Sequence, residues 1–217
     1  MSRALRANVA VAREAIRADL DVSQLGDVSF RRLESAAPDR ATHLADPAAG
    51  LRLSPESLAA LEPGGDDVAI VVSDGLSAEA VHHAVPELLP VLLDGLAGGG
   101  ARVAQPMALH RGRVKAAERI ADALACRLVV MLLGERPGGD ENASRSLSAY
   151  LVLWLSGEER SLAAEFSGNP DVRFEYSVIS NIHAGGLPPV EAGGVIARQA
   201  LDILERGAAG NRLAAQA

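Results

Sequence analysis

The residues best suited to chemistry in this chain lie in one short segment, Ser180 to Ala192, which reads SNIHAGGLPPVEA. It places a histidine, an asparagine and a glutamate among two adjacent glycines and two adjacent prolines. Glycine permits a positive φ and proline fixes φ, so the segment predicts a rigid corner between a strand at 174–179 and a helix at 189–206. Such a corner exposes backbone donors at the carboxyl edge of a sheet, where open α/β folds bind ligands. A well-made turn without a ligand accounts for the same residues equally well.

Few other side chains suggest catalysis. His183, inside the corner, is the one histidine that we consider functional, because His82 and His83 fall on a predicted helix and are most simply exposed to solvent. Asp74 follows a predicted strand, where an aspartate is more often a turn former or helix cap than a catalyst. No phosphate loop, HExxH motif, Ser/His/Asp order or paired-carboxylate spacing stands out. The sequence therefore predicts a ligand-binding edge without catalytic residues.

Composition narrows the classes of function. The chain has 217 residues, of which 48% are apolar and 3% aromatic, and a net charge of −7. Scarce aromatic rings and net negative charge both disfavour nucleic-acid binding. Cys126 is the only cysteine, so we expect a buried apolar residue and neither a disulfide nor a thiolate metal site. The chain opens without a signal peptide, and its apolar runs are shorter than a membrane span, so we expect a cytoplasmic protein that does not cross a membrane.

The elements that must position these residues alternate between strand and helix after residue 66. Apolar runs predict strands at 68–72, 101–104, 128–133, 150–155 and 174–179, and helical spacing predicts helices at 78–97, 115–125 and 189–206. This alternation predicts an α/β domain over 67–207, with a mainly parallel, Rossmann-like sheet and helices on both faces. The alanine-rich tail at 208–217 is expected to be disordered.

The first 66 residues are predicted to form a smaller helical segment. Over 4–20, apolar side chains recur at helical spacing and form a stripe that must pack on the rest of the chain or on another subunit. Ser54 and Pro55 supply an N-cap and a first helical residue for a short helix. A run of proline, glycine and aspartate at 63–67 marks the boundary with the α/β domain.

If the predicted strands are parallel, the loops that follow three of them meet at one edge of the sheet. These loops are Ser73–Ser77, Gly134–Gly138 and the Asn181–His183 corner. Each combines glycine with polar groups, which suits a crevice for a large polar ligand. Glu135 and Arg136 also fit a plain surface ion pair, which carries no functional meaning.

Six phrases of the sequence together indicate a family. They are Asp39–Thr42 with Asp46-Pro47, Ser73–Ser77, Arg111–Val114, Gly134–Gly138, Ser146–Tyr150, and Ile179–His183 continuing to Pro188–Ala192. In this order, over about residues 5 to 205, the chain resembles the small (light) subunit of ethanolamine ammonia-lyase, an adenosylcobalamin-dependent enzyme.

The resemblance implies a hetero-oligomer that converts ethanolamine, or another vicinal amino alcohol, to an aldehyde and ammonia. In the family, a large TIM-like barrel subunit holds the substrate and performs the radical chemistry, and the small subunit covers part of the cobalamin at the interface. Carried over residue by residue, the cobalamin contacts fall on Val114, Glu135 and Val178. The resemblance places no catalytic or metal-ligating residue on this chain, and it adds a bacterial microcompartment to the expected cytoplasmic location.

Departures from the family keep a second function open. Val178 stands where the family usually has cysteine, and the link at 156–171 is longer and more polar than usual. The family's segment ahead of its first helix has no counterpart here, from which we expect weaker docking to the large subunit. The alternative is a non-catalytic scaffold or binding module that keeps the fold and the partner surface. A stand-alone enzyme is less favoured, because no nucleophile–base pair is visible.

Overall fold

One mixed sheet organises the chain. The computed structural model describes residues 18–135 and 146–216. Its six strands lie in the order β1-β3-β2-β4-β5-β6. The strands are Arg31–Glu34 (β1), Val68–Ser73 (β2), Met107–His110 (β3), Leu128–Gly134 (β4), Leu147–Trp154 (β5) and Phe174–Ile182 (β6). Most of the helix predicted over 4–20, with its interface role, lies outside the described residues.

Strand direction decides which loops share an edge. β1, β3, β2 and β4 pair in parallel, whereas β5 runs antiparallel to both β4 and β6. β6 therefore runs in the same direction as β4, and the loops after β2, β4 and β6 leave from one edge. The predicted mainly parallel α/β sheet is confirmed, and the reversed β5 distinguishes it from an all-parallel sheet.

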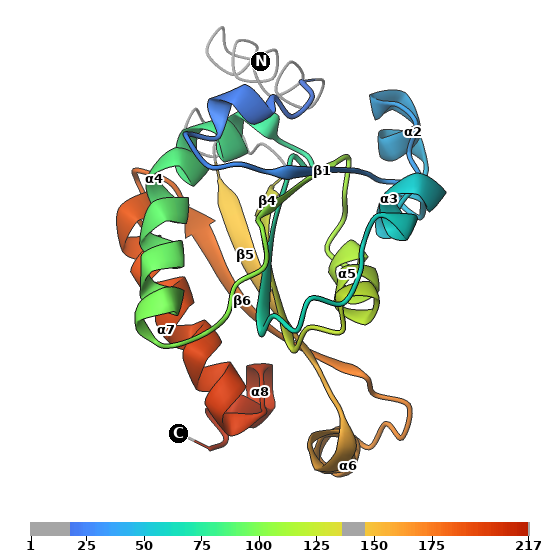
Figure 1. The fold of residues 1–217 in the computed structure, drawn as a ribbon, viewed down its shortest axis with the longest axis vertical. Helices are drawn as coiled ribbons and strands as arrows, with labels where there is room; N and C mark the ends of the chain where they lie inside the picture. The colour runs from blue at the N-terminus through green and yellow to red at the C-terminus, as the bar shows by residue number, and fades with distance from the viewer. Residues whose placement is uncertain (1–17, 136–145, 217) are drawn as a thin grey trace, which may run out of the picture.

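Helices cover both faces of the sheet, as predicted. α4 (Ala78–Gly98) and α7 (Pro189–Arg206) lie side by side on one face, and α5 (Ala116–Leu124) lies on the other (Figure 1). Alternate side chains of the central strands point to opposite faces of the sheet. Ile70 and Val130 pack toward α4 and α7, whereas Val71 and Met131 pack toward α5. The core is aliphatic, as the low aromatic content requires. The shorter helices are η1 (Val22–Gln24), α2 (Arg40–Ala45), η2 (Ala49–Leu51), α3 (Pro55–Ala59), α6 (Gly157–Ser167) and α8 (Gly210–Ala214).

The predicted strand at 101–104 is wrong. Val103 makes only an isolated bridge with Val68, at the first residue of β2. Pro106 then interrupts the ladder because it has no N–H to donate, and pairing resumes at Met107 opposite Val71. The strand therefore forms after the proline, at β3.

β1 was not predicted, and it joins residues ahead of the expected boundary at 63–67 to the same sheet as the later strands. Its burial explains why the sequence pattern missed it, since Leu33 is the one buried residue among its four. The short helix after Ser54 is confirmed as α3, and the Ser54 hydroxyl accepts the backbone N–H of Ser57 at 3.1 Å.

The expectation of a disordered tail is also corrected. Gly207, with φ of 57°, ends α7, and the chain then turns back to form α8 beside β6. Arg212 is buried and its Nε and Nη2 donate to the two carboxylate oxygens of Glu175 at 2.7 and 2.9 Å. A paired, partly buried arginine of this kind outweighs the disorder that the alanine-rich composition favours.

Candidate functional site at the carboxyl edge of the sheet

The loops after β2 and β4 touch directly at the carboxyl edge. The backbone N–H of Leu76 donates to the carbonyl of Gly134 at 2.8 Å. A Cβ added to Gly134 would collide with the carbonyl oxygens of Asp74 and Ser77, so only glycine allows this approach. In the ladder, Gly134 faces Leu147, and Leu147 faces Ile182 of the corner. The expectation that the three loops share one edge is confirmed for their described residues, which in the loop after β4 are Gly134 and Glu135.

Val178 and Glu135, two of the residues implied by the resemblance, are joined through Tyr150. Tyr150 lies opposite Val178 in the β5–β6 ladder, so both side chains stand on the same face of the sheet. The Tyr150 hydroxyl donates to Oε1 of Glu135 at 2.8 Å. The backbone N–H of Glu135 is itself fixed, because it donates to the carbonyl of Ser146 at 3.0 Å.

Val114 lies in the turn just ahead of α5. Glu118, in the first turn of α5 and four residues after Val114, accepts a hydrogen bond from the hydroxyl of Tyr176. Tyr176 lies two residues before Val178, on the same face of β6. Val114, Tyr150 and Tyr176 all pack on the apolar cluster between α5 and the sheet. The structure therefore places the three implied residues on the face of the sheet that α5 covers.

This surface is open and mainly apolar. Val178 is 52% exposed although it belongs to a strand, and Val114, Glu135 and Tyr150 are half-buried. α5 packs on β4 and β5, which leaves the Val178 side of β6 accessible. Two valines and a tyrosine ring beside one carboxylate can bind a large, partly apolar molecule that carries hydrogen-bond donors.

Tyr150 is a site residue that reasoning from the sequence missed. It is the last residue of the Ser146–Tyr150 phrase, and that phrase was its only signal. Burial, and then its hydrogen bond to Glu135, raises the pKa of Tyr150 to about 12. The hydroxyl therefore keeps its proton at neutral pH and acts as a donor.

Behind the edge lies a buried polar cluster built around the loop after β2. Arg40 Nη1 and His43 Nε2 both donate to the carbonyl of Gly75, at 2.8 and 2.9 Å. Arg40 also lies 3.4 Å from the carboxylate of Asp74, which is fully buried. Burial raises the pKa of Asp74, and the charge of Arg40 opposes that shift. Desolvation and the nearby guanidinium groups of Arg113 and Arg40 lower the pKa of His43 to about 4, so its ring is neutral.

The same cluster fixes the turn that leads to Val114. Asp74 Oδ1 accepts the N–H of Arg111 at 2.7 Å, and Ser73 Oγ accepts the N–H of Gly112 at 3.0 Å. Arg111 has a φ of 56°, a conformation that non-glycine residues rarely adopt without such support. Asp74 is therefore neither a helix cap nor exposed to substrate. Ser77 caps α4 instead, by accepting the N–H of Ala80 at 3.1 Å.

The structure assigns His183 to the turn itself. Its Nδ1 accepts the N–H of Gly185 at 3.1 Å, so the proton lies on Nε2, which donates to Oδ1 of Asn181 at 2.7 Å. Asn181 has a φ of 61°, which asparagine tolerates better than most residues. Both ring nitrogens of His183 are thus used inside the corner, and the well-made-turn interpretation of this residue is the one that the geometry favours.

The remaining candidates also have local explanations. His82 is half-buried rather than solvent-facing, and its Nε2 accepts the N–H of Asp21 at 2.9 Å, whereas His83 is exposed as expected. Arg136, the other half of the suggested surface ion pair, lies outside the described residues. Cys126 is buried as predicted, and burial raises the pKa of its thiol to about 12.

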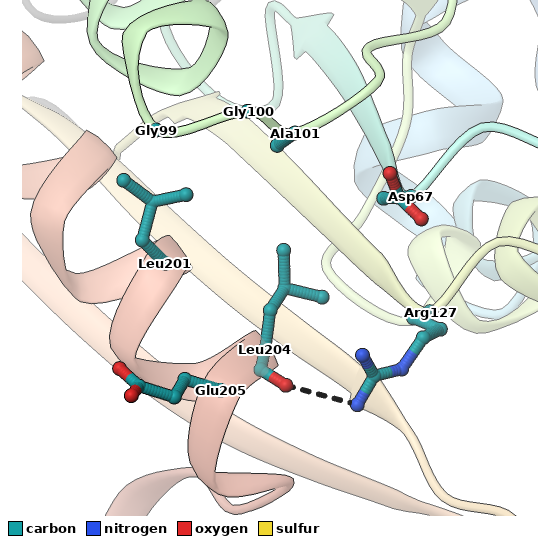
Figure 2. A pocket seen from close by; sticks show the side chains of 8 residues that line it. All are labelled: Asp67, Gly99, Gly100, Ala101, Arg127, Leu201, Leu204 and Glu205. Carbon is teal, nitrogen blue, oxygen red and sulfur yellow. Dashed lines mark hydrogen bonds between the residues drawn. The ribbon is translucent and has the colours of Figure 1, made fainter.

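A pocket of about 380 Å³ lies at the opposite edge of the sheet, between the ends of α4 and α7 (Figure 2). Its two charged residues nearest the sheet are already engaged. Arg127 donates to the carbonyl of Leu204 at 3.0 Å, as Figure 2 shows, and to Glu159 at 2.9 Å, while Asp67 is paired with Arg102 at 3.2 Å. Because these two charged side chains are already paired, the pocket is a weaker candidate for ligand binding than the carboxyl edge.

Two further observations concern only residues 18–135 and 146–216. None of the helices described there is both long and apolar enough to span a membrane. Within the same ranges, no group of three or more histidine, cysteine, aspartate or glutamate residues is arranged to hold a metal ion.

Comparison with known protein families supplies the identity that the geometry alone does not. A family model described as "Ethanolamine ammonia-lyase light chain (EutC)" matches residues 1–214, which is nearly the whole chain. The match covers the sheet, the three loops at its carboxyl edge and α8. Ethanolamine ammonia-lyase is a lyase complex, and a light chain implies a larger partner subunit. The chain belongs to the ethanolamine ammonia-lyase light chain family.

Proposed function

We propose that this chain is the small subunit of an adenosylcobalamin-dependent ethanolamine ammonia-lyase and that it covers part of the cobalamin where it meets the large barrel subunit. The observation that supports this most directly is the convergence of Val114, Glu135 and Val178. Val114 precedes α5, Glu135 follows β4 and Val178 belongs to β6, and all three lie on the face of the sheet that α5 covers. The same resemblance supports our expectation of a hetero-oligomer, and it adds a bacterial microcompartment as an alternative to the cytoplasm at large.

The residues present suit a corrinoid. A corrin ring has an apolar rim and amide side arms that donate hydrogen bonds. Val114 and the half-exposed Val178 provide apolar contact, and the Glu135 carboxylate is an acceptor whose Oε1 is already oriented by Tyr150. Among the described residues, no thiolate or imidazole is aimed at this surface. The residues present therefore suit contact with the periphery of the ring.

The part played by this chain is binding and orientation. When bound, adenosylcobalamin supplies the radical chemistry. Glu135 would accept a hydrogen bond from a side-arm amide, and the two valines would exclude water from the covered rim. Because His183 and Asp74 are both engaged in holding loops, neither is available here to move a proton to or from a substrate. The substrate site is therefore proposed for the large subunit.

The test is reconstitution with the large subunit. Ammonia release from ethanolamine should require both chains and adenosylcobalamin, and the single chain should be inactive. Glu135→Ala should weaken cobalamin binding to the complex by about 1–3 kcal/mol, as for the loss of a desolvated hydrogen bond. Glu87→Ala, an exposed change on α4, is the matched control and should leave the titration unchanged.

Two results would overturn the proposal. Ammonia release by the purified single chain would make it an enzyme in its own right. A complex that assembles normally but does not bind cobalamin would identify the chain as the non-catalytic scaffold considered above.

A further inference from the structure

We infer that Tyr150 is a positioning residue of the cobalamin surface, which acts by holding the Glu135 carboxylate in the orientation that receives the ligand. This inference rests on the proposed function, because it assigns Tyr150 a role toward the same ligand. Its basis is the hydrogen bond of 2.8 Å from the Tyr150 hydroxyl to Oε1 of Glu135, which joins two elements at the edge.

Glu135 needs such a partner because of where it lies. It is the first residue after β4, so the ladder no longer restrains its side chain. A glutamate has three rotatable side-chain bonds, and ordering them costs free energy when a ligand binds. The hydroxyl of Tyr150 fixes one carboxylate oxygen in advance and leaves the second to accept a bond from the ligand, so less ordering is left for the binding step.

Tyr150 is itself rigidly placed. It stands within β5, paired with Met131 on one side and Val178 on the other. Its ring packs on the apolar layer beneath α5, so the position of the hydroxyl is fixed. Burial raises the pKa of Tyr150, so the hydroxyl keeps its proton at neutral pH and donates to Glu135.

The chain contains a matched control for this arrangement. Tyr176, the only other tyrosine, makes the same type of hydrogen bond to Glu118 of α5 and stands on the same face of the sheet. The Tyr176 bond ties a helix to a strand further from the carboxyl edge. Removing either hydroxyl deletes the same atoms, but only the Tyr150 change touches a proposed ligand contact.

Cobalamin titration of the reconstituted complex tests the inference. Tyr150→Phe should weaken binding about 3- to 10-fold, and Tyr176→Phe should change it less than 2-fold. In a Glu135→Ala background, Tyr150→Phe should have no further effect, because the residue acts through that carboxylate. Additive effects of the two changes would overturn the inference. If Glu135→Ala alone leaves the titration unchanged, the proposed cobalamin surface itself fails, which separates the two claims.

A second measurement needs no cobalamin. With 3-fluorotyrosine incorporated, the free chain should give two fluorine resonances, one for each tyrosine, and Tyr176→Phe assigns them. Glu135→Gln should shift the Tyr150 resonance and leave the Tyr176 resonance in place, and Glu118→Gln should do the reverse. A Tyr150 resonance that does not respond to Glu135→Gln would show that the hydrogen bond does not form in solution.

Discussion

The guanidinium of Arg40 lies 3.4 Å from the fully buried carboxylate of Asp74. This ion pair joins the first turn of α2 to the loop after β2. Arg40 also donates to the carbonyls of Gly75 and Ala18, at 2.8 and 2.6 Å, so one side chain ties three segments together behind the carboxyl edge. The geometry of the candidate site therefore depends on a buried charge that never contacts the ligand surface.

Removing Arg40 should destabilise the whole domain. Arg40→Met leaves Asp74 buried without its counter-charge, and the free energy of unfolding should fall by about 3–5 kcal/mol. The matched control is Arg102→Met, which breaks the exposed Arg102–Asp67 pair and should cost at most about 1 kcal/mol. Urea unfolding of both variants measures the difference, and equal, small losses would contradict the role assigned to the buried pair.

Protonation of His43 should make the domain acid-sensitive. Its pKa is about 4 in the folded chain against an ordinary value of 6.5, so the unfolded chain binds the proton more readily. The stability that this difference supplies is complete above pH 6.5 and is lost as the pH falls toward 4, by about 3 kcal/mol in all. Urea unfolding at pH 4.5, 5.5 and 7 should show the loss.

Two substitutions make that pH prediction specific. His43→Gln keeps a donor for the Gly75 carbonyl but cannot titrate, so its stability should change less between pH 7 and 4.5. His83→Gln changes an exposed histidine and should leave the wild-type pH dependence intact. Identical pH slopes in wild type and His43→Gln would show that another group is responsible.

Val178 offers a direct chemical test of the covered surface. Val178→Cys restores the residue that the family usually has, at a half-exposed position where stability should change by less than about 0.5 kcal/mol. Its thiol should react with iodoacetamide in the free chain and be protected in the complex with the large subunit and cobalamin. The native Cys126 is buried with a raised pKa and should stay unreactive in both. Equal labelling of the free and assembled Val178→Cys variant would remove Val178 from the interface.

Removing the ion pair between Arg212 and Glu175 should destabilise the packing of the tail after α7. Arg212→Met removes both hydrogen bonds to Glu175 and leaves that carboxylate, 13% exposed, without its partner. We expect a loss of about 3 kcal/mol in unfolding free energy and faster proteolysis after residue 207. Arg206→Met is the control, since the hydrogen bond that Arg206 makes among the described residues is to an exposed carbonyl, that of Gln216. Unchanged proteolysis of Arg212→Met would contradict the anchoring role.

Local patterns in the sequence predicted the central elements well, and the reason is physical. β2 and β4 are buried on both faces, which demands the continuous apolar runs that made them recognisable. β1 has a single buried residue and β3 follows a proline, so neither carries a periodic signal. The order of the tail depends on Arg212 meeting Glu175, a contact between distant positions that composition does not reveal.

The site shows the same division. That the three loops share an edge followed from parallel strands, and the proposed ligand contacts came from the family resemblance. The supporting residues did not, because nothing in the local sequence says that Arg40 is buried or that Tyr150 faces Glu135. Those facts depend on pairings across the fold: Arg40 with the loop after β2, and Tyr150 with Val178 in a register that only the assembled sheet defines.

The reversal of β5 has a consequence for how fast and how selectively this surface can bind. Because β5 runs against its neighbours, its first half lies at the carboxyl edge, where a parallel strand would place its last half. Tyr150 and Val178 are thus held by ladder hydrogen bonds on an already ordered plane, so their part of the surface need not rearrange to receive a ligand. The rate of ligand association at these two residues should therefore be limited by diffusion and not by a conformational change. A similar ligand of a different shape should bind more weakly, because the rigid surface does not adjust to it.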